Sequence, residues 1–405
     1  MRLRSSLALL AVTAFLATMG TAHAQAQGYS DGVVKLGVLT DLSGAYSDFA
    51  GKGSVTAVQM AIEDFGGTVN GVPIKMISAD HLNKADTGAS IAREWYDRGQ
   101  VDAIFDQSNS AVSLAVMGIT REKSRVVMVG GSSTTRITTD SCTPNSVQYV
   151  YDANALSNVT AKALVKQGAK SWYFVTVDFA FGHGLEKTTT DVVNNAGGKV
   201  LGAIRHPLNA ADFASYITQA QSSGADVIAL ANGGTDTVNA IKTANEFGIG
   251  TGKQRIASLL TFITDVHSMG LAQAKGIMLT EAFYWDLNDE TREWSRRFFE
   301  RTRRMPTMVQ AGMYSAAMHY LKAVAASKTD SATEVMAKMK ATPVNDFFTK
   351  NGKIREDGLH VHDMYLMQVK QPSESKYPWD YYKVVAKVPG DQAFSPMSPA
   401  CSLVK

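Results

Sequence analysis

The hydrophobic positions of the chain follow two alternating patterns. Short runs rich in Val, Ile and Leu, such as 33–39 and 101–105, predict buried strands, and the stretches between them repeat an apolar residue every third or fourth position, which predicts amphipathic helices. The alternation runs from residue 33 to residue 130 and restarts after the segment 149–154. Strands that alternate with helices are typical of parallel βαβ units. We therefore predict an α/β protein with two open sheets in series, each covered by helices on both faces.

Beyond residue 280 the pattern becomes mostly helical. Helices are expected over 290–304, 308–327 and 333–340, and strands over 364–369 and 381–388, which would complete the two sheets. The 405 residues are 45% hydrophobic and 19% charged, which excludes a disordered chain and a coiled coil. This length is enough for two or three domains.

The first 24 residues have the features of an export signal. Arg2 and Arg4 precede an apolar run over 7–16, and Thr21-Ala-His-Ala24 has the A-x-A form of a cleavage site. The apolar run is too short to span a bilayer. We therefore predict a signal peptide over 1–24, cleaved after Ala24, and an exported protein.

Net charge and cysteine content limit which partners the protein can be expected to bind and indicate the redox state of its compartment. Loss of Arg2 and Arg4 would bring the basic and acidic residues nearly level, so charge gives no reason to expect nucleic acid as a partner. Cys142 and Cys401 are the two cysteines, and in an oxidising compartment we expect them to form one disulfide. This bond would tie the tail, 391–405, to the body of the protein. In the chain-entropy model, closing a loop of roughly 260 residues stabilises by at most roughly 5 kcal/mol.

The loops that follow the strands of the first half are candidate ligand contacts, because ligands of open α/β sheets bind at the carboxyl ends of the strands. Tyr46 and Phe49 follow the first strand and offer ring faces to a planar or apolar ligand. Asn109 and Ser110 open a helix, where backbone N–H groups are free to bind a carboxylate. Simple N-capping is the alternative role for these polar residues.

A second cluster of donors, Gly131, Ser132 and Ser133, follows the next strand. Hydroxyl and N–H groups on two adjacent strand ends favour carboxylate binding over capping alone. No Lys or Arg is needed for such a site.

The second half repeats the arrangement at its own strand ends. Asp178 and Phe181 follow one strand, Asn232 follows another, and Tyr284 follows a third. We expect these residues to face the ligand from the second sheet.

Sequence signatures of enzymes and metal sites are missing. The chain has no G-x-S-x-G, no H-E-x-x-H and no G-x-G-x-x-G after a strand, so we expect neither an enzyme nor a cofactor. His360 and His362 lie two positions apart in a strand that we expect to be exposed, so they share one face of it. Two histidines alone favour a structural role over metal binding. We predict no metal site.

The chain resembles the leucine/isoleucine/valine-binding family of periplasmic solute-binding proteins, which serve ABC importers. The resemblance rests on the leader and on the order of four segments: Val34-Lys-Leu-Gly-Val-Leu-Thr-Asp-Leu-Ser-Gly, Asn109-Ser-Ala, Val177-Asp-Phe-Ala-Phe-Gly and Gly276-Ile-Met-Leu-Thr. It implies two Rossmann-like lobes, the type I periplasmic-binding-protein fold, which close on a ligand about a three-segment hinge. It also implies a periplasmic, non-enzymatic and monomeric protein that passes its ligand to permease subunits in the inner membrane.

The resemblance also implies a division of the chain and a set of contacts. Lobe 1 would comprise 29–150 and 284–355, and lobe 2 would comprise 151–283 and 356–390, with crossings near 149–152, 280–285 and 353–358. The first-lobe hydroxyl and main-chain groups would hold a ligand carboxylate, and Phe49 and Phe181 would be the aromatic residues that cover the ligand.

One departure from the family bears on the ligand. The acidic residue that should pair with a ligand ammonium would follow the strand that ends near Ser258, where this chain has Leu259-Leu-Thr-Phe262. Burying an ammonium group without a hydrogen-bond acceptor costs on the order of several kcal/mol. We therefore predict a small organic acid, aromatic or branched, as the ligand. An amino acid paired with Asp178 or Glu281, a small amide or urea, and a ligand-sensing role remain alternatives.

Overall fold

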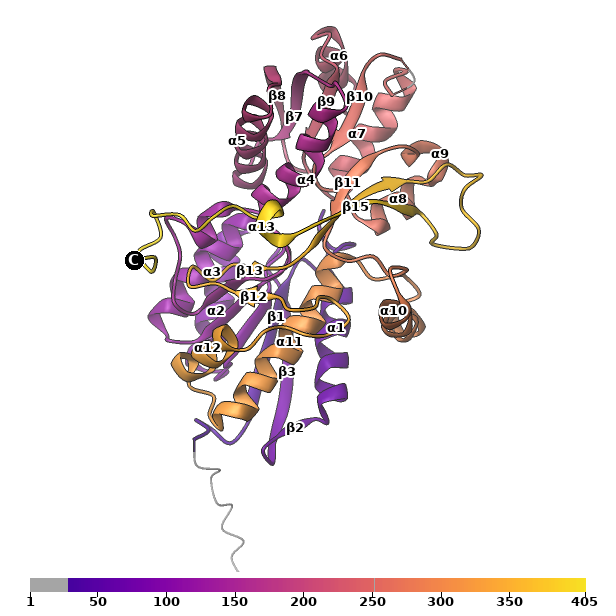
Figure 1. Ribbon diagram of the computed structural model, residues 1–405. Coiled ribbons are helices and arrows are strands. Elements are labelled where there is room, and N and C mark those ends of the chain that lie inside the picture. Colours follow the sequence, from indigo (N-terminus) through magenta and orange to yellow (C-terminus); the bar gives the residue numbers. More distant parts are fainter. Residues whose placement is uncertain (1–27, 251) are drawn as a thin grey trace, which may run out of the picture.

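The computed structural model describes residues 28–250 and 252–405, so the predicted signal peptide, 1–24, lies outside the described residues. Two α/β lobes are stacked one above the other (Figure 1). Lobe 1 holds a six-stranded sheet of order β2-β3-β1-β4-β5-β6, and lobe 2 a seven-stranded sheet of order β15-β14-β11-β10-β9-β7-β8. The predicted fold class, two α/β lobes with mainly parallel sheets, is confirmed.

Lobe 1 is formed by two separate parts of the chain. Its strands are β1 (Val34–Thr40), β2 (Thr68–Val69), β3 (Val72–Asp80), β4 (Ala103–Asp106), β5 (Val126–Val129) and β6 (Ser146–Gln148). Its helices are α1 (Gly51–Phe65), α2 (Ala85–Asp97), α3 (Ser110–Glu122), the 3-10 turn η1 (Thr135–Thr138), α10 (Asp289–Thr302), α11 (Met308–Ser327) and α12 (Ala332–Ala341). Helices α1 and α11 pack together, as do α2 and α3.

Lobe 2 holds the middle of the chain and its last two long strands. Its strands are β7 (Ser171–Val177), β8 (Lys199–His206), β9 (Val227–Ala231), β10 (Arg255–Ser258), β11 (Met278–Glu281), β14 (Met364–Val369) and β15 (Tyr382–Val388). Its helices are α4 (Ala153–Lys166), α5 (Ala180–Asn195), α6 (Ala214–Ser222), α7 (Thr235–Glu246), α8 (Ile263–Met269) and α9 (Leu271–Ala274). Only β14 and β15 run antiparallel to their neighbours in this sheet.

The burial of each strand explains its sequence pattern. The central strands β4, β5 and β9 are buried along their whole length, since helices cover both faces, and they read as continuous apolar runs. The edge strand β8 instead alternates between exposed and partly buried residues.

The hydrophobic pattern predicts a helix over 185–195, but helix α5 begins five residues earlier. It starts at Ala180, directly after β7, because Gly182 lets the first turn lie against the strand end: a Cβ at Gly182 would lie 2.2 Å from the carbonyl oxygen of Val177. The early start places Phe181 in the first turn of the helix, at the carboxyl end of the sheet.

Three segments connect the lobes. The first is 149–152, between β6 and α4, and the second is 282–288, between β11 and α10. The third lies after Val361, a few residues beyond the expected 353–358. The displacement arises because β12 (Lys353–Ile354) and β13 (His360–Val361) form a hairpin on lobe 1, where Leu359 bridges to Gln148 of β6.

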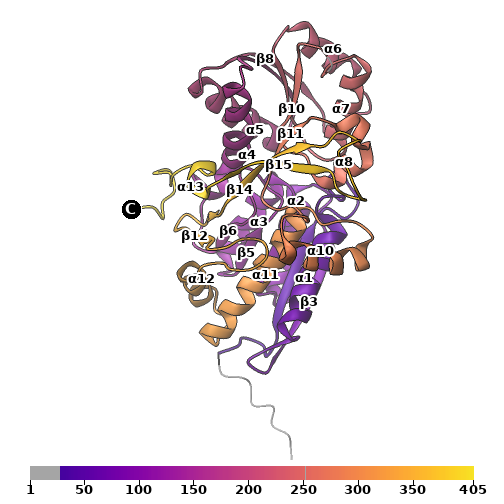
Figure 2. The ribbon, with the colours of Figure 1, turned by 45° about the vertical axis from the view of Figure 1, so that its right-hand side comes forward.

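The predicted disulfide is present. Cys142 of lobe 1 is bonded to Cys401, which is fully buried, so the C-terminal tail is attached covalently to the body of the protein. The tail includes the short helix α13 (Gly390–Ala393) and runs at the level where the lobes meet (Figure 2).

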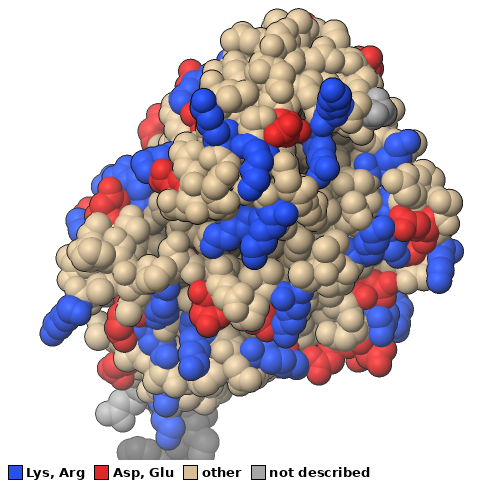
Figure 3. All heavy atoms as spheres, turned by 45° about the horizontal axis from the view of Figure 1, so that its top comes forward, with Lys and Arg blue, Asp and Glu red and all other residues tan. Residues whose placement is uncertain are grey.

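The described surface carries charges of both signs. Figure 3 brings the lobe 2 end of the molecule forward and shows Asp and Glu among the Lys and Arg side chains, with uncharged surface between them. Among the described residues, no helix combines the length and hydropathy needed to cross a bilayer.

We predict that a single added methyl group at Gly312 destabilises the protein. Gly312 lies on α11 against the first crossover, and its added Cβ would lie 2.4 Å from Val150 Cγ2. Overpacking of this kind costs about 1–3 kcal/mol, more than alanine gains as a helix former. Urea denaturation of Gly312→Ala should show a lower free energy of unfolding.

The matched control is Gly118→Ala on α3, which is exposed and has no atom within 4 Å of its added Cβ. Here the alanine should stabilise by about 0.5–1 kcal/mol. Equal effects of the two substitutions would contradict the packing argument.

Candidate functional site

The carboxyl ends of the parallel strands in both lobes face the region where the lobes meet. Lobe 1 contributes the loops after β1, β4 and β5, and lobe 2 those after β7, β9 and β10. All three crossovers pass the same level (Figures 1 and 2). We call this region the interlobe site.

Aromatic rings from opposite lobes contact one another in the interlobe site. Phe49 of lobe 1 stacks on Phe262 of lobe 2, with ring centroids 4.2 Å apart and planes inclined by 16°. Tyr46 meets Phe181 edge to face at 6.4 Å. All four side chains are buried. The site is therefore a closed apolar contact between the lobes.

Two features of the loops, one in each lobe, allow the lobes to approach each other this closely. Gly234, at the N-terminus of α7, has φ +60°, and a Cβ at this position would lie 2.2 Å from the carbonyl oxygen of Ala45. On the lobe 1 side, Asp41 accepts hydrogen bonds from the backbone N–H groups of Gly44 and Tyr46 and so shapes the loop that carries Tyr46.

The expected donor cluster of lobe 1 is present and buried. Ser132 Oγ donates to Ser110 Oγ at 3.1 Å, which joins the loop after β5 to the N-terminus of α3. Gly131 makes this approach possible, since a Cβ there would lie 2.8 Å from Ser108 Cα. Ser133 Oγ is buried and has no hydrogen-bond partner within the described residues. It is therefore available to a ligand.

Asn109 has the capping role that was the alternative. Its Oδ1 accepts from the backbone N–H groups of Ala111 and Val112, and its Nδ2 donates to Asn83 Oδ1. The side chain thus fixes the start of α3. Since the carbonyl oxygen accepts from the N–H and hydroxyl groups of Ser113, only the backbone N–H of Asn109 is left to serve a ligand.

The backbone immediately before this cluster is strained. Asp106 and Gln107 have φ of 82° and 53°, a region that non-glycine residues rarely adopt, and both side chains are buried without a hydrogen-bond partner in the described part of the chain. Strain of this kind is typical of ligand-binding loops.

Three carboxyl groups lie buried around the interlobe site. Burial raises the pKa of Asp106 to about 6 and that of Asp236 to about 6, and it raises the pKa of Glu281 well above its usual range. Each has at least one buried oxygen with no hydrogen-bond partner among residues 28–250 and 252–405. Burial, together with the charge of Asp236, also raises the pKa of Tyr46 across the interlobe contact.

Other predicted site residues lie elsewhere or are already paired. Asp178 is more than half exposed and binds His183 at 2.7 Å. Asn232 is buried, but its amide contacts His206 and Thr237 within lobe 2. Tyr284 packs in the lobe 2 core, and its hydroxyl donates to the carbonyl of Trp379.

Sequence reasoning does not identify some residues of the interlobe site. Phe262 was noted only for the missing acidic group, although it stands directly on Phe49. Asp236 and Tyr151 were not singled out, yet each has a buried oxygen without a partner in the described residues. Their position after strand ends was the available signal, but the opposing lobe that buries them could not be inferred.

His360 and His362 lie at the hinge and are buried, so the expectation of an exposed strand was wrong. His360 Nδ1 lies 2.9 Å from the carbonyl oxygen of Tyr149, and His362 Nε2 lies 3.0 Å from that of Val150. His362 thus joins the third crossover to the first, and His360 joins the lobe 1 hairpin to the same first crossover. In the described part of the chain, no cluster of three or more His, Cys, Asp or Glu side chains could hold a metal ion.

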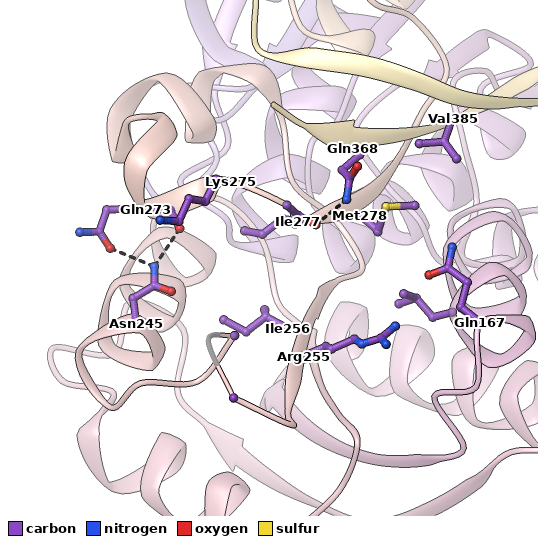
Figure 4. Close-up of a pocket in the computed structure, with 14 residues that line it drawn as sticks. Gln167, Asn245, Arg255, Ile256, Gln273, Lys275, Ile277, Met278, Gln368 and Val385 are labelled. Carbon is purple, nitrogen blue, oxygen red and sulfur yellow. Dashed lines mark hydrogen bonds between the residues drawn. The ribbon is translucent and has the colours of Figure 1, made fainter. Parts of the chain in front are cut away.

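Grooves flank the interlobe site on two sides. One, of 690 Å³, lies between η1, α4, α5 and the C-terminal tail, and the other, of 480 Å³, lies between the N-terminus of α1 and α10. A separate pocket of 440 Å³ lies at the opposite, amino end of the lobe 2 strands (Figure 4). There Asn245 and Gln273 bind each other, and Gln368 donates to the carbonyl of Gly276 (Figure 4).

Comparison with known proteins agrees with this architecture. Residues 33–376 match the family described as periplasmic binding protein. A periplasmic binding protein of Burkholderia mallei is 50% identical, with a TM-score of 0.90 over 93% of this chain and 100% of its own. The chain therefore belongs to the periplasmic-binding-protein family.

Two further relatives indicate the branch of the family. A branched chain amino acid ABC transporter periplasmic ligand-binding protein of Burkholderia xenovorans is 40% identical, with a TM-score of 0.81 over 90% of this chain and 97% of its own. A Leu/Ile/Val-binding protein homolog of Brucella melitensis is 25% identical over 87% of this chain and 92% of its own. The predicted resemblance is confirmed, and both relatives are named as ligand-binding proteins, as expected for a protein that is not an enzyme.

More distant structures share the fold. One is the solute binding protein of an ABC transporter of R. palustris in complex with benzoate, 19% identical, with a TM-score of 0.79 over 88% of this chain and 97% of its own.

We predict that Asp265→Asn stabilises the protein at neutral pH. Asp265, on α8 beside Phe262, is buried, and burial raises its pKa to about 7. Because the folded state holds this proton more tightly than the unfolded state, whose aspartate pKa is about 3.9, the wild type loses stability as pH rises from about 4 to about 7. Asparagine has no charge to bury and can still accept from the Phe262 N–H, as Asp265 does.

Urea midpoints measured between pH 4 and pH 8 check this. The two proteins should be alike near pH 4 and diverge towards pH 7, with Asp265→Asn the more stable. Parallel curves over this range would contradict a raised pKa.

Proposed function

We propose that this protein is the periplasmic solute-binding component of an ABC importer and captures a small organic acid, aromatic or branched, between its lobes. The closed state would pass the ligand to permease subunits in the inner membrane. The exported location follows from the predicted signal peptide and from the family.

The observation that carries this proposal is the contact of Phe49 and Tyr46 with Phe262 and Phe181 across the lobes. Residues from both lobes meet there, so a ligand bound between them would gain its full set of contacts only when the lobes close. Ligand binding and hinge closure would then favour each other.

A carboxylate would find donors beside these rings. Ser133 Oγ has no partner among the described residues, and the backbone before α3 already lies close to the loop after β5. Helices α5 and α7 begin at the same level with no side-chain cap on their first N–H groups. These free donors and the positive ends of the helix dipoles favour an anionic group.

The aromatic surroundings support an aromatic acid. With the lobes apart, the faces that Phe49 and Phe262 turn to each other would be open to a ligand ring, and the structural neighbour from R. palustris carries benzoate. The missing acid at 259–262 argues against a plain α-amino acid.

A second candidate is an amino acid or a small amide, as the relatives named for branched-chain amino acids suggest. The unpartnered oxygens of Asp106, Asp236 and Glu281 favour it, because they would accept hydrogen bonds from an ammonium or an amide. Glu281 was one of the two acids expected to take this role, whereas Asp178 points to His183 instead. A sensing role would use the same closure.

We predict that benzoate and 4-hydroxybenzoate raise the thermal midpoint of residues 25–405, whereas leucine and valine leave it unchanged. A ligand that binds only the folded state stabilises it by mass action, by about 2.7 kcal/mol at a hundredfold excess over Kd. Thermal-shift screening with these compounds, branched aliphatic acids and small amides checks this. A shift with leucine and none with any acid would move the function to the second candidate.

We predict that Ser133→Ala weakens benzoate binding at least about tenfold, since a hydrogen bond to a charged group contributes about 1.5–3 kcal/mol. The thermal midpoint of the free protein should be unchanged because Ser133 Oγ has no partner in the described residues. Isothermal titration measures the affinity. Ser295→Ala is the matched control, because Ser295 Oγ is also buried without a partner there but lies on α10, away from the interlobe site. Equal affinities of both variants would remove Ser133 from the site.

A further inference from the structure

The C-terminal residues 389–401, which we call the strap, cross from one lobe to the other. They leave lobe 2 after β15, and α13 packs on α4 of that lobe. Asn158 Nδ2 of α4 donates to the carbonyl oxygen of Ala393 at 2.9 Å. Among the described residues, it is the last hydrogen bond along the strap to lobe 2.

Two residues further on, the strap is bound to lobe 1. The guanidinium of Arg355 donates to the carbonyl oxygen of Ser395 at 2.7 Å and also pairs with Asp357. Arg355 belongs to the hairpin that Leu359 bridges to β6, so this contact is fixed to the lobe 1 sheet. The strap therefore changes lobes between Ala393 and Ser395.

The crossing residue itself lies in the hinge. The ring of Phe394 packs on His362, with centroids 5.3 Å apart, and His362 in turn contacts the carbonyl of Val150 in the first crossover. Gly390 lies against the third crossover as well, since a Cβ there would be 2.8 Å from the carbonyl oxygen of His362. The strap thus packs directly on the third connection and, through His362, is coupled to the first, and both must bend when the lobes move.

The far end of the strap is covalently attached to lobe 1. Cys401 is bonded to Cys142, which lies between η1 and β6, and its side chain is fully buried. The bond keeps the chain next to Arg355, so a hydrogen bond that breaks during opening can re-form at high effective concentration.

We propose that the strap is a fourth interlobe connection, closed by the Cys142–Cys401 disulfide, which limits how far the lobes separate in the open state. A hinge needs large torsional changes in only a few residues. A short segment bound on both sides of that hinge restricts those changes, and the disulfide makes the restriction depend on oxidation. The inference rests on the two-lobed architecture and not on the identity of the ligand.

The test measures the distance between the lobes in the ligand-free protein. Nitroxide labels on Ser90→Cys of α2 and Ser215→Cys of α6, both exposed, report this distance by pulsed electron resonance. Removal of the disulfide in Cys142→Ser/Cys401→Ser should shift the distribution to longer distances and broaden it. Asn158→Ala, which keeps the disulfide but loses the lobe 2 contact, should give a smaller shift in the same direction.

The control for Asn158→Ala is Asn194→Ala, an exposed position on α5 that makes none of the contacts of the strap. It should reproduce the distribution of the labelled parent. If the disulfide-free protein and Asn158→Ala both reproduce that distribution as well, the strap does not limit opening and the proposal is wrong. If the disulfide-free protein has a lower thermal midpoint but the same interlobe distance as the labelled parent, the disulfide contributes to stability alone and the proposal is wrong. Because no ligand is used, this result is separate from the ligand screen.

Discussion

The arrangement of the molecule depends on one constraint, which is that the carboxyl ends of the parallel strands of both lobes face each other. A parallel sheet places every strand-to-helix loop at the same edge. When two such sheets are opposed, their loops and the N-termini of their helices meet. This explains why residues as distant in sequence as Phe49 and Phe262 are in contact and why the crossovers pass through the same level.

The interlobe contact combines favourable and unfavourable terms. Aromatic pairs contribute about 0.5–1.5 kcal/mol each beyond their burial, whereas each buried polar group without a partner costs about 1–3 kcal/mol. The rings of Phe49 and Phe262 provide the favourable term. The unfavourable term comes from Ser133, Asp236 and Glu281, each of which has one buried oxygen without a partner in the described residues. A contact of this composition is suited to reversible closure, since a ligand that satisfies the polar groups tips the balance.

Side-chain contacts join the segments of the hinge to one another. His362 binds the third crossover to a carbonyl group of the first, His360 does the same for the hairpin just before it, and Phe394 of the strap packs on His362. Buried histidines and a disulfide-bound tail thus occupy the place where the backbone has to bend. These contacts would set the range of opening, whereas the aromatic and polar residues between the lobes would set which ligand stabilises closure.

The sequence by itself determined the local features of this protein. Apolar periodicity located nearly all helices and strands, because burial on one or both faces leaves a direct trace in the order of residues, and the two cysteines could pair only with each other. Resemblance added the family. The hairpin over 353–361 and the burial of His360 were decided by tertiary contacts with β6 and Tyr149. The start of α5 depends on the close approach of Gly182 to the ends of β7 and β9, at Val177 and Ala231. The same division holds for the site. The sequence placed Phe49, Phe181 and Ser133 at strand ends. Only the packing of one lobe on the other decides that Phe262 and Asp236 lie in the interlobe site, whereas Asp178 and Asn232 do not. Interlobe burial depends on contacts between residues about 200 positions apart, and no local pattern encodes such contacts.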